Sequence, residues 1–422
     1  MPLCGALLKA AGDETVGGVA SRTEHSPTHD SNLCEKIKLN KRRPLEDFMP
    51  DWSAISVVVL GVTAFSVTQG LTYPLISLLL ESRGVSAGLI GLNASAFAVG
   101  LAAATLMIGR LTALAAGDKL IIAALIGCSV CLASFAVFES IWIWFAARFF
   151  LGFCASVIFM LSEAWLNTAC PDRLRGRAAG LYSAGLCAGF AAGPLAIPLF
   201  GSENGFAFAL IAVYTALVAF GTAILSRKAR TKPQASSAGG LIRFIRRGPV
   251  LVGMVLAFGF ADITAISVMP IYFIKIGHSE SFAAFSVTIM ALPTAFAQPL
   301  VGMLLDKISR PAVATACAFV AAFSFLIIPY LQSQFAILVV FAIMGTASVA
   351  LYTCALTLLG ERYTGGLLLT GSAVISLAYA IGSAAGSTAT GFAMDIFGPS
   401  GAPISAGLVL LVFALCVALV RR

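Results

Sequence analysis

Charged residues are scarce in this sequence: Asp, Glu, Lys and Arg together make up only 11% of its 422 residues. A soluble domain carries roughly 25% charged residues, because charged side chains cover its hydrated surface. Most of this chain therefore cannot form the surface of a soluble protein. The shortage of charge indicates instead that most of the chain is embedded in lipid.

Histidine and clustered metal ligands are also rare. The chain has three histidines, His25, His29 and His278, and none of them stands in a ligand pattern. Cys128 and Cys131 have the spacing of a metal-binding pair, but no histidine or second cysteine pair accompanies them. We expect the cysteines in apolar stretches to act as small hydrophobic side chains. We expect neither a metal nor a cofactor.

Convergent catalytic groups are missing from the pattern as well. A membrane-embedded enzyme needs paired carboxylates, a histidine cluster or a nucleophile beside a base. The polar residues of this chain occur singly within its apolar stretches. We therefore expect no enzyme, and both a transporter and a non-transporting receptor remain compatible with these features.

Apolar sequence is abundant and accounts for 59% of the residues. About 20 consecutive apolar residues form a helix that crosses the hydrocarbon core of a bilayer. We predict an all-α, polytopic membrane protein with twelve transmembrane helices. The expected spans are 54–80, 86–108, 119–138, 141–162, 178–199, 206–226, 249–274, 282–304, 312–330, 335–358, 367–392 and 403–420.

The net charge of the chain is +8, and its Lys and Arg residues are concentrated on one side of the expected membrane. All but three of them fall in one set of alternating segments. The exceptions are Arg83 and Lys275 on the opposite side and Arg148 inside a span. This asymmetry follows the positive-inside rule. It predicts a multi-pass protein of the bacterial inner membrane with both termini in the cytoplasm, and it argues against nucleic acid as a partner.

Polar segments divide the chain into parts. The first segment has no apolar core of signal-peptide type, and we expect a disordered cytoplasmic tail there, with a translation start at Met49 as the alternative. A linker of flexible composition separates two regions of six spans, which we expect to form two pseudo-symmetric six-helix bundles. A shift of 189 residues aligns Arg173 with Arg362 and Gly193 with Gly382, in support of an internal repeat. The expected parts are 1–50, 51–226, 227–248 and 249–422.

Two charged residues fall deep inside predicted spans, Arg148 in the fourth and Asp262 in the seventh. An arginine at the centre of a membrane helix costs about 2.5–3.5 kcal/mol on insertion scales, so Arg148 should face a cavity or a partner. Asp262 suits a proton-binding group, a polar contact to the solute or a structural carboxyl. Glu163 lies near the inner end of its span, where we expect an interfacial role. Further candidates for polar contacts in a central cavity are Gln69, Tyr73, Asn93, Tyr272 and Gln298.

Charges in the inner turns are candidates for gating. The turn after the eighth span contains Asp306, Lys307 and Arg310, and Glu361–Arg362 could pair with them and latch the cytoplasmic side. Ordinary topogenic charge is the alternative interpretation. The candidate gating residues are Gly109, Asp118, Arg175, Arg177, Gly302, Asp306, Lys307, Arg310, Glu361 and Arg362. In the fifth span, Gly180, Gly189, Gly193 and Pro194 are candidates for close helix packing.

Several of these motifs resemble those of the major facilitator superfamily. The stretch from Gly302 through Asp306 to Arg310 resembles the signature of its inner turns, and Arg148-Phe-Phe-Leu-Gly152 is similar to its span-four motif. In the turn after span two, Ala113 stands where the signature has an acid, so an inner latch there would use Asp118. The resemblance implies alternating access, with a solute site at the midplane built from spans one, four, seven and ten.

A narrower resemblance concerns Glu163-Ala-Trp165-Leu-Asn167 and the stretch Gly391-Phe-Ala-Met-Asp395, which are similar to a subgroup of bacterial permeases that includes riboflavin permeases. We expect a monomer in the lipid bilayer that takes up a small, largely uncharged organic solute, with riboflavin as the best candidate and a proton as a candidate coupling ion. The span-five glycines resemble the antiporter signature of the superfamily. A proton-coupled exporter of drugs or metabolites is therefore the alternative.

Overall fold

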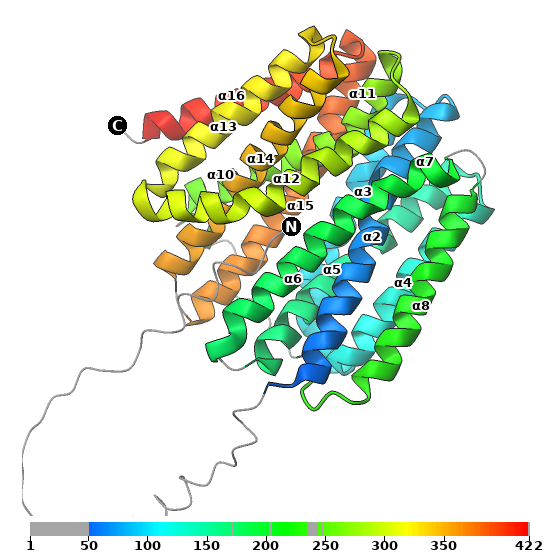
Figure 1. Ribbon diagram of the computed structural model, residues 1–422, viewed down its shortest axis with the longest axis vertical. Coiled ribbons are helices and arrows are strands. Elements are labelled where there is room, and N and C mark those ends of the chain that lie inside the picture. Colours follow the sequence, from blue (N-terminus) through cyan, green and yellow to red (C-terminus); the bar gives the residue numbers. More distant parts are fainter. Residues whose placement is uncertain are drawn as a thin grey trace, which may run out of the picture.

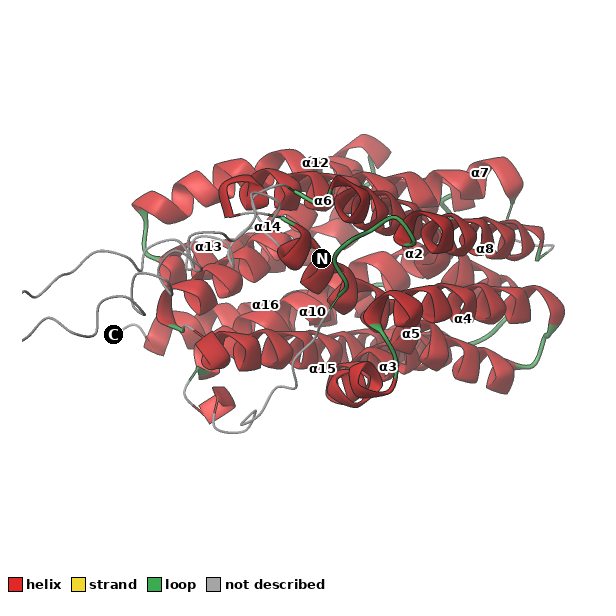
Figure 2. Ribbon diagram, turned by 90° about the horizontal axis from the view of Figure 1, so that it is seen from below, coloured by secondary structure: helices red, strands yellow, loops and turns green. Residues whose placement is uncertain are grey.

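A computed structural model gives the structure of residues 50–170, 172–201, 205–233, 244–246, 248–363 and 365–420. The expected tail, 1–50, lies outside the described residues except for Pro50, as does half of the expected linker, 234–243 and 247. All regular structure in the described part is helical (Figures 1 and 2). The predicted all-α architecture is therefore confirmed.

The helices fall into two sets of six membrane crossings. The first set is α2 (Trp52–Ser82), α3 (Ala87–Leu114), α4 (Gly117–Val137), α5 (Ile141–Ala169), α6 (Asp172–Ala192) continued by η2 (Gly193–Ala196) and α7 (Ile197–Phe200), and α8 (Phe206–Ser226). The second set is α10 (Pro249–Ile263) continued by η3 (Thr264–Val268) and α11 (Met269–Lys275), α12 (Glu280–Lys307), α13 (Arg310–Ile327) continued by η4 (Ile328–Tyr330), α14 (Gln334–Arg362), α15 (Gly365–Phe397) and α16 (Gly401–Val420).

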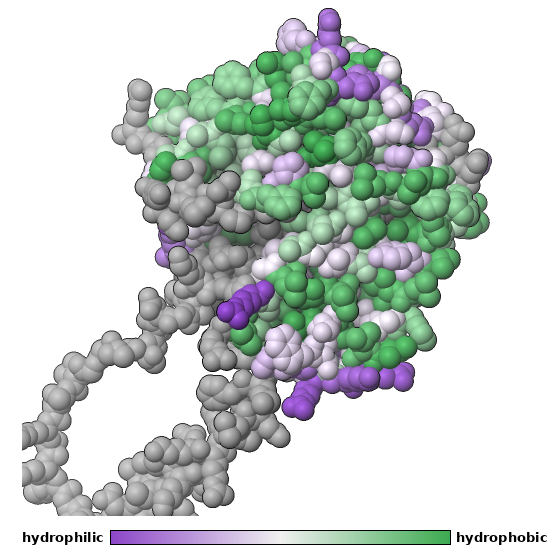
Figure 3. Space-filling view, viewed as in Figure 1, coloured by the Kyte–Doolittle hydropathy of each residue, from purple (hydrophilic) through white to green (hydrophobic). Residues whose placement is uncertain are grey.

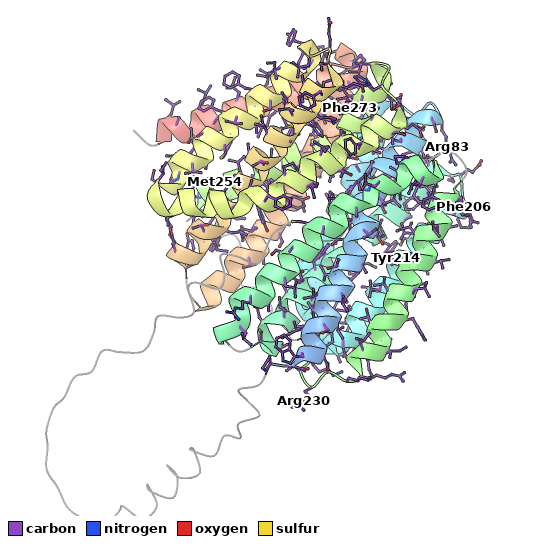
Figure 4. The ribbon with its side chains drawn as sticks, in the orientation of Figure 1. Arg83, Phe206, Tyr214, Arg230, Met254 and Phe273 are labelled. Atoms are coloured by element: carbon purple, nitrogen blue, oxygen red, sulfur yellow. The ribbon has the colours of Figure 1, made fainter. Side chains whose placement is uncertain are left out.

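Eleven helices of the described part are long and apolar enough to cross a membrane. The helix α12 is a twelfth long helix, of 28 residues. Several of its side chains lie outside the described part. Figure 3 shows the matching surface, hydrophobic over the middle of the visible face and hydrophilic toward its two ends. Figure 4 places Arg83 and Arg230 at opposite ends of the first set of helices, as the charge asymmetry predicts.

Several helices extend beyond their apolar runs at the inner side. The fourth span was expected to end at 162, whereas α5 continues to Ala169, and α14 continues to Arg362. Hydropathy marks where a sequence leaves the hydrocarbon core, but a helix keeps its backbone hydrogen bonds after that point. The inner ends of α5 and α14 therefore carry polar residues on helical positions.

Glycines allow the helices within each half to approach closely. A Cβ atom added at Gly152 of α5 would collide with the carbonyl oxygen of Phe97 on α3, and one at Gly100 of α3 would collide with that of Phe149 on α5. Gly185 and Gly189 of α6 and Gly193 of η2 face α2. A Cβ atom would meet the Thr63 hydroxyl at Gly185 and backbone atoms of α2 at the other two positions. Gly180 differs from this set, because it is exposed and a Cβ there would meet open space. The structure thus places Gly189 and Gly193 at helix contacts but not Gly180.

The two halves touch each other at their outer ends. The Ser77 and Ser267 hydroxyls are 2.9 Å apart between α2 and η3. The Thr288 hydroxyl of α12 donates to the carbonyl oxygen of Ala191 on α6 at 2.9 Å. Figure 1 shows α6 and α12 side by side where the two halves meet. The division of the chain at 227–248 remains our proposal for the domain boundary.

The beginning of the expected linker is bound to the inner face of the first half. Asp51, the N-cap of α2, accepts hydrogen bonds from the backbone N–H groups of Arg230 at 2.7 Å and Thr231 at 2.9 Å. Burial raises the pKa of Asp51, but hydrogen bonds from Thr231, Ala54 and Arg230 outweigh burial and hold its pKa below the usual value. The indole of Trp165 donates to the carbonyl oxygen of Thr231 at 2.9 Å. This segment is therefore part of the folded inner face.

Candidate functional site

A cavity lies between the two halves and is lined by both. It contains about 580 Å³ of empty space and is partly open to its surroundings. Water-sized molecules reach about 60 Å³ of this space. Small-molecule pockets commonly measure roughly 300–1,000 Å³, so the cavity must widen to hold an organic solute. Its lining comes from α3, α5 and α6 of the first half and from α10, α14 and α15 of the second: Leu101, Thr105, Ser156, Phe159, Met160, Glu163, Leu186, Phe258, Tyr352, Ser376 and Tyr379.

The cavity lies in the inner half of the molecule. Thr105 is 18 residues from the outer end of α3, and Tyr352 is 18 residues from the outer end of α14. At about 1.5 Å per residue, both side chains start roughly 27 Å below those ends. The outer contacts between the halves therefore close the molecule above the cavity. A cavity in the inner half with closed contacts on its outer side is an inward-facing arrangement.

Glu163 is the acidic residue among the described lining residues. Tyr352 of the opposite half lines the same cavity, and no hydrogen bond or ion pair to Glu163 occurs among the described contacts. The structure thus places Glu163 at the cavity, while its role stays a prediction. Because α5 runs on to Ala169, Glu163 is still inside the helix and turns toward the cavity.

Arg148 is enclosed by protein, with 1% of its surface exposed. Its Nε donates to the Oδ1 atom of Asn93 at 3.2 Å, and its guanidinium carbon lies 5.7 Å from the centroid of the Tyr73 ring. The stacking of a cation over an aromatic face is favourable. Its Nη1 and Nη2 atoms are buried and have no hydrogen-bond partner within the described part of the chain. The structure thus brings together three sequence candidates, from α5, α3 and α2.

Asp262 is on α10, in the second half. Its Oδ2 atom accepts a hydrogen bond from the Tyr379 hydroxyl at 2.8 Å. Tyr379 and Asp262 are thus paired within the second half, as Arg148 and Tyr73 are within the first. Arg148 and Tyr73 of the first half, together with Tyr379 and Asp262 of the second, are called the polar row below. Tyr379 also lines the cavity.

The helix that carries Asp262 is irregular directly after it. One turn of π-helix occupies Thr264–Val268, and Pro270 follows at the start of α11. Such turns are frequent at functional sites. The irregular turn makes the crossing α10–α11 a natural bending point next to the polar row.

The other cavity candidates are distributed differently. Gln69 and Tyr272 are both buried, but neither is among the described lining residues of the cavity. Tyr272 instead packs its ring against Phe273 at 5.4 Å. The side chain of Gln298 lies outside the described part. The sequence did not indicate Tyr352 or Tyr379, since a tyrosine inside a Gly- and Ala-rich span shows no pattern that separates a lining position from a packing position.

The inner-turn charges are paired in part as expected. Arg310 forms an ion pair with Glu361, as the sequence suggested for these two turns. Asp118 forms an ion pair with Lys232 of the bound linker segment. Both residues of this pair lie on the inner face of the first half. Gly109 is half-buried near the inner end of α3, and Arg177 and Arg362 are exposed. The side chains of Arg175, Gly302, Asp306 and Lys307 lie outside the described part. A gating role for the set remains a prediction.

The described residues include no group of three His, Cys, Asp or Glu side chains that could hold a metal ion. The chemistry available at the cavity is therefore that of hydroxyl groups, aromatic rings and a carboxyl. Such groups can bind and release a solute or a proton.

Comparison with known proteins agrees with this geometry. Relatives named uncharacterized MFS-type transporters include YfkF of Bacillus subtilis, 25% identical over 81% of this chain and 88% of its own, and YcaD of Escherichia coli, 23% identical over 81% and 89%. Among solved structures, the nucleoside transporter NupG has a TM-score of 0.70 at 11% identity, covering 87% of this chain and 98% of its own. A bacterial homologue of the human lysosomal transporter Spinster, inward-facing and occupied, has a TM-score of 0.69 at 17% identity, covering 88% and 96%.

The family assignment comes from the sequence itself. The family model described as Major Facilitator Superfamily matches residues 58–279 and 251–422, which is most of the chain. Together the two matches cover both sets of helices that enclose the cavity, and the first match extends through α11. The protein is therefore a multi-pass membrane transporter, not an enzyme, and it belongs to the Major Facilitator Superfamily.

Proposed function

We propose that this transporter moves a small, largely uncharged organic solute with an aromatic ring, and that riboflavin uptake is the activity to test first. The observation that carries the proposal is the lining of the cavity. Phe159, Phe258, Tyr352 and Tyr379 supply aromatic surface from both halves, while no Lys or Arg is among the described lining residues. A strongly anionic solute such as a sugar phosphate needs basic partners, and this lining offers none.

Riboflavin matches the chemistry of the lining. Its flat ring system can stack on aromatic side chains, and its hydroxylated chain can exchange hydrogen bonds with Thr105, Ser156 and Ser376. The narrower resemblance through Glu163–Asn167 supports the same solute. The names of the relatives specify no substrate, so riboflavin stands as our proposal and requires a direct test.

The first test is growth on external riboflavin. Cells that cannot synthesise riboflavin should grow at a lower external concentration when they express this protein. Ser156→Trp places a large ring in the cavity and should remove the advantage, whereas Phe150→Trp, on a side chain exposed on the outside of α5, should keep it. Equal growth with and without the wild-type protein would eliminate riboflavin as the solute.

Proton-coupled export of a drug or metabolite is the second candidate, and Glu163 is the observation that favours it. A carboxyl in the cavity without a hydrogen-bond partner among the described residues can bind a proton or a cationic solute. The glycines of α6 do not decide the direction, because Gly189 and Gly193 are accounted for by contact with α2. Export therefore rests on Glu163 alone.

Replacement of Glu163 by Gln separates coupling from solute movement. If Glu163 carries the coupling proton, Glu163→Gln should reduce transport driven by a pH gradient at least tenfold but leave counterflow without a gradient largely intact. Both can be measured in proteoliposomes with labelled riboflavin and with a fluorescent cationic dye. Glu139→Gln, at an exposed acid between α4 and α5, is the matched control. Undiminished stimulation by the gradient in Glu163→Gln would exclude this role.

A further inference from the structure

Asp395, at the outer end of α15, binds the first turn of α3 in the opposite half. Its Oδ1 atom accepts a hydrogen bond from the backbone N–H of Ala87 at 2.9 Å, and its Oδ2 atom accepts one from that of Gly88 at 2.7 Å. The first N–H groups of a helix have no partner within the helix. The carboxylate of one half therefore satisfies two free donors of the other.

Close packing of the two backbones brings this contact within reach. A Cβ atom at Gly91 of α3 would collide with the carbonyl oxygen of Ser387 on α15, and one at Gly391 would lie 2.5 Å from that of Ala87. Neither backbone could give way without separating the helices. The glycines therefore hold α3 and α15 together at the position where Asp395 meets the helix terminus.

A second charged contact joins the halves at their outer ends. Lys275 at the end of α11 forms an ion pair with Glu81 near the end of α2 at 3.0 Å. It joins a different pair of helices from the contact of Asp395. Each contact links the two halves, and each lies on the outer side of the cavity. An opening of the outer side must break both.

We propose that Asp395 is a positioning residue of the transport cycle: it clasps α15 to the first turn of α3 while the outer side is closed and releases it when that side opens. A negative charge at a helix N-terminus is stabilised by the helix dipole, so the closed state gains from the contact. Release leaves α3 intact, because the hydroxyl oxygen of Ser86 still accepts from the N–H of Leu89 at 3.4 Å. The clasp can thus open and close without unfolding the helix.

The clasp predicts a shift of the conformational equilibrium in Asp395→Ala. Loss of both hydrogen bonds should raise the outward-open to inward-open ratio on the order of fivefold, the effect of removing a typical helix cap. Asp395→Asn retains one acceptor oxygen and should have a smaller effect. Glu81→Gln should shift the ratio in the same direction, and the effects should add for separate sites. Glu139→Gln, an exposed acid at the same outer side, is the matched control.

Hydrogen–deuterium exchange of the full-length protein in nanodiscs measures this shift without any solute. In Asp395→Ala, exchange should become faster at the outer ends of α3 and α15 and slower in the cavity-lining stretches of α5 and α14, which close as the outer side opens. Faster exchange confined to the first turn of α3 would show a local capping role and overturn the proposal. Unchanged exchange in both regions would overturn it as well. Failure of riboflavin as the solute would leave this test unaffected.

Discussion

Arg148→Met is expected to abolish transport while the protein still unfolds within a few degrees of the wild-type temperature. A buried arginine is costly, about 2.5–3.5 kcal/mol at a helix centre, and its removal recovers that cost. Two losses of stability oppose this gain. The unsatisfied Asn93 oxygen costs about 1–3 kcal/mol, and the lost contact with Tyr73 costs about 0.5–2 kcal/mol. The opposing effects nearly cancel.

Transport should respond differently from stability. The buried Nη1 and Nη2 donors of Arg148 have no partner among the described residues in this inward-facing structure. A group kept in the interior against its own cost is expected to serve function. We expect these donors to find partners in another state of the cycle or in the bound solute. Their removal should lower the transport rate at least a hundredfold.

The measurement pairs thermal unfolding of the purified protein with counterflow in proteoliposomes. Arg177→Met, at an exposed position on α6, serves as the control and should change neither property strongly. Wild-type transport by Arg148→Met would remove Arg148 from the mechanism. A fall of more than about 10 °C in the unfolding temperature would show that Arg148 mainly holds the fold.

Gly152→Val is expected to prevent folding, whereas Gly91→Val is expected to fold but to transport poorly. At Gly152 the added Cβ would strike the Phe97 carbonyl oxygen within one half, where α3 and α5 stay together throughout the cycle. Relief requires separating two core helices, and overpacking of this kind costs about 1–3 kcal/mol or more. Gly152→Val should therefore yield little folded protein.

At Gly91 the collision is with Ser387 of the other half, and an opening of the outer side relieves it. That motion belongs to the transport cycle. Gly91→Val should therefore fold, remain outward-open and transport at a small fraction of the wild-type rate.

Yield of monodisperse protein, unfolding temperature and hydrogen exchange distinguish these two outcomes. Gly221→Val is the matched control, because a Cβ at this glycine of α8 meets open space. It should fold and transport normally. Folded, active Gly91→Val would refute the assignment of Gly91 to the outer closure, and well-folded Gly152→Val would show that α3 and α5 can separate at low cost.

The sequence predicts the parts of this structure that depend on local pattern. Apolar runs locate the crossings, the distribution of basic residues orients them, and the rarity of charge inside the spans singles out Arg148 and Asp262. The ion pair between Arg310 and Glu361 could be anticipated because both residues lie next to short turns on the same side. Each of these inferences uses residues close in sequence or a rule about the membrane.

Contacts that depend on how the halves meet could not be read from the sequence. Glu163 was assigned to the interface because apolar sequence stops near it, while the helix continues to Ala169. Tyr379 and Asp395 act on groups of distant helices, namely Asp262 and the first turn of α3. A single tyrosine or aspartate has no neighbouring signal for a partner that lies more than a hundred residues away.

The most direct test of alternating access is the distance between the inner ends of α5 and α14, measured by pulsed electron resonance. Spin labels at Asn167 and Arg362, carried by non-canonical amino acids, leave the native cysteines in place, and both positions are exposed. Two distance populations are expected, with the shorter one enriched in Asp395→Ala. A single distance that no variant and no solute changes would contradict a transporter whose two halves alternate around the cavity.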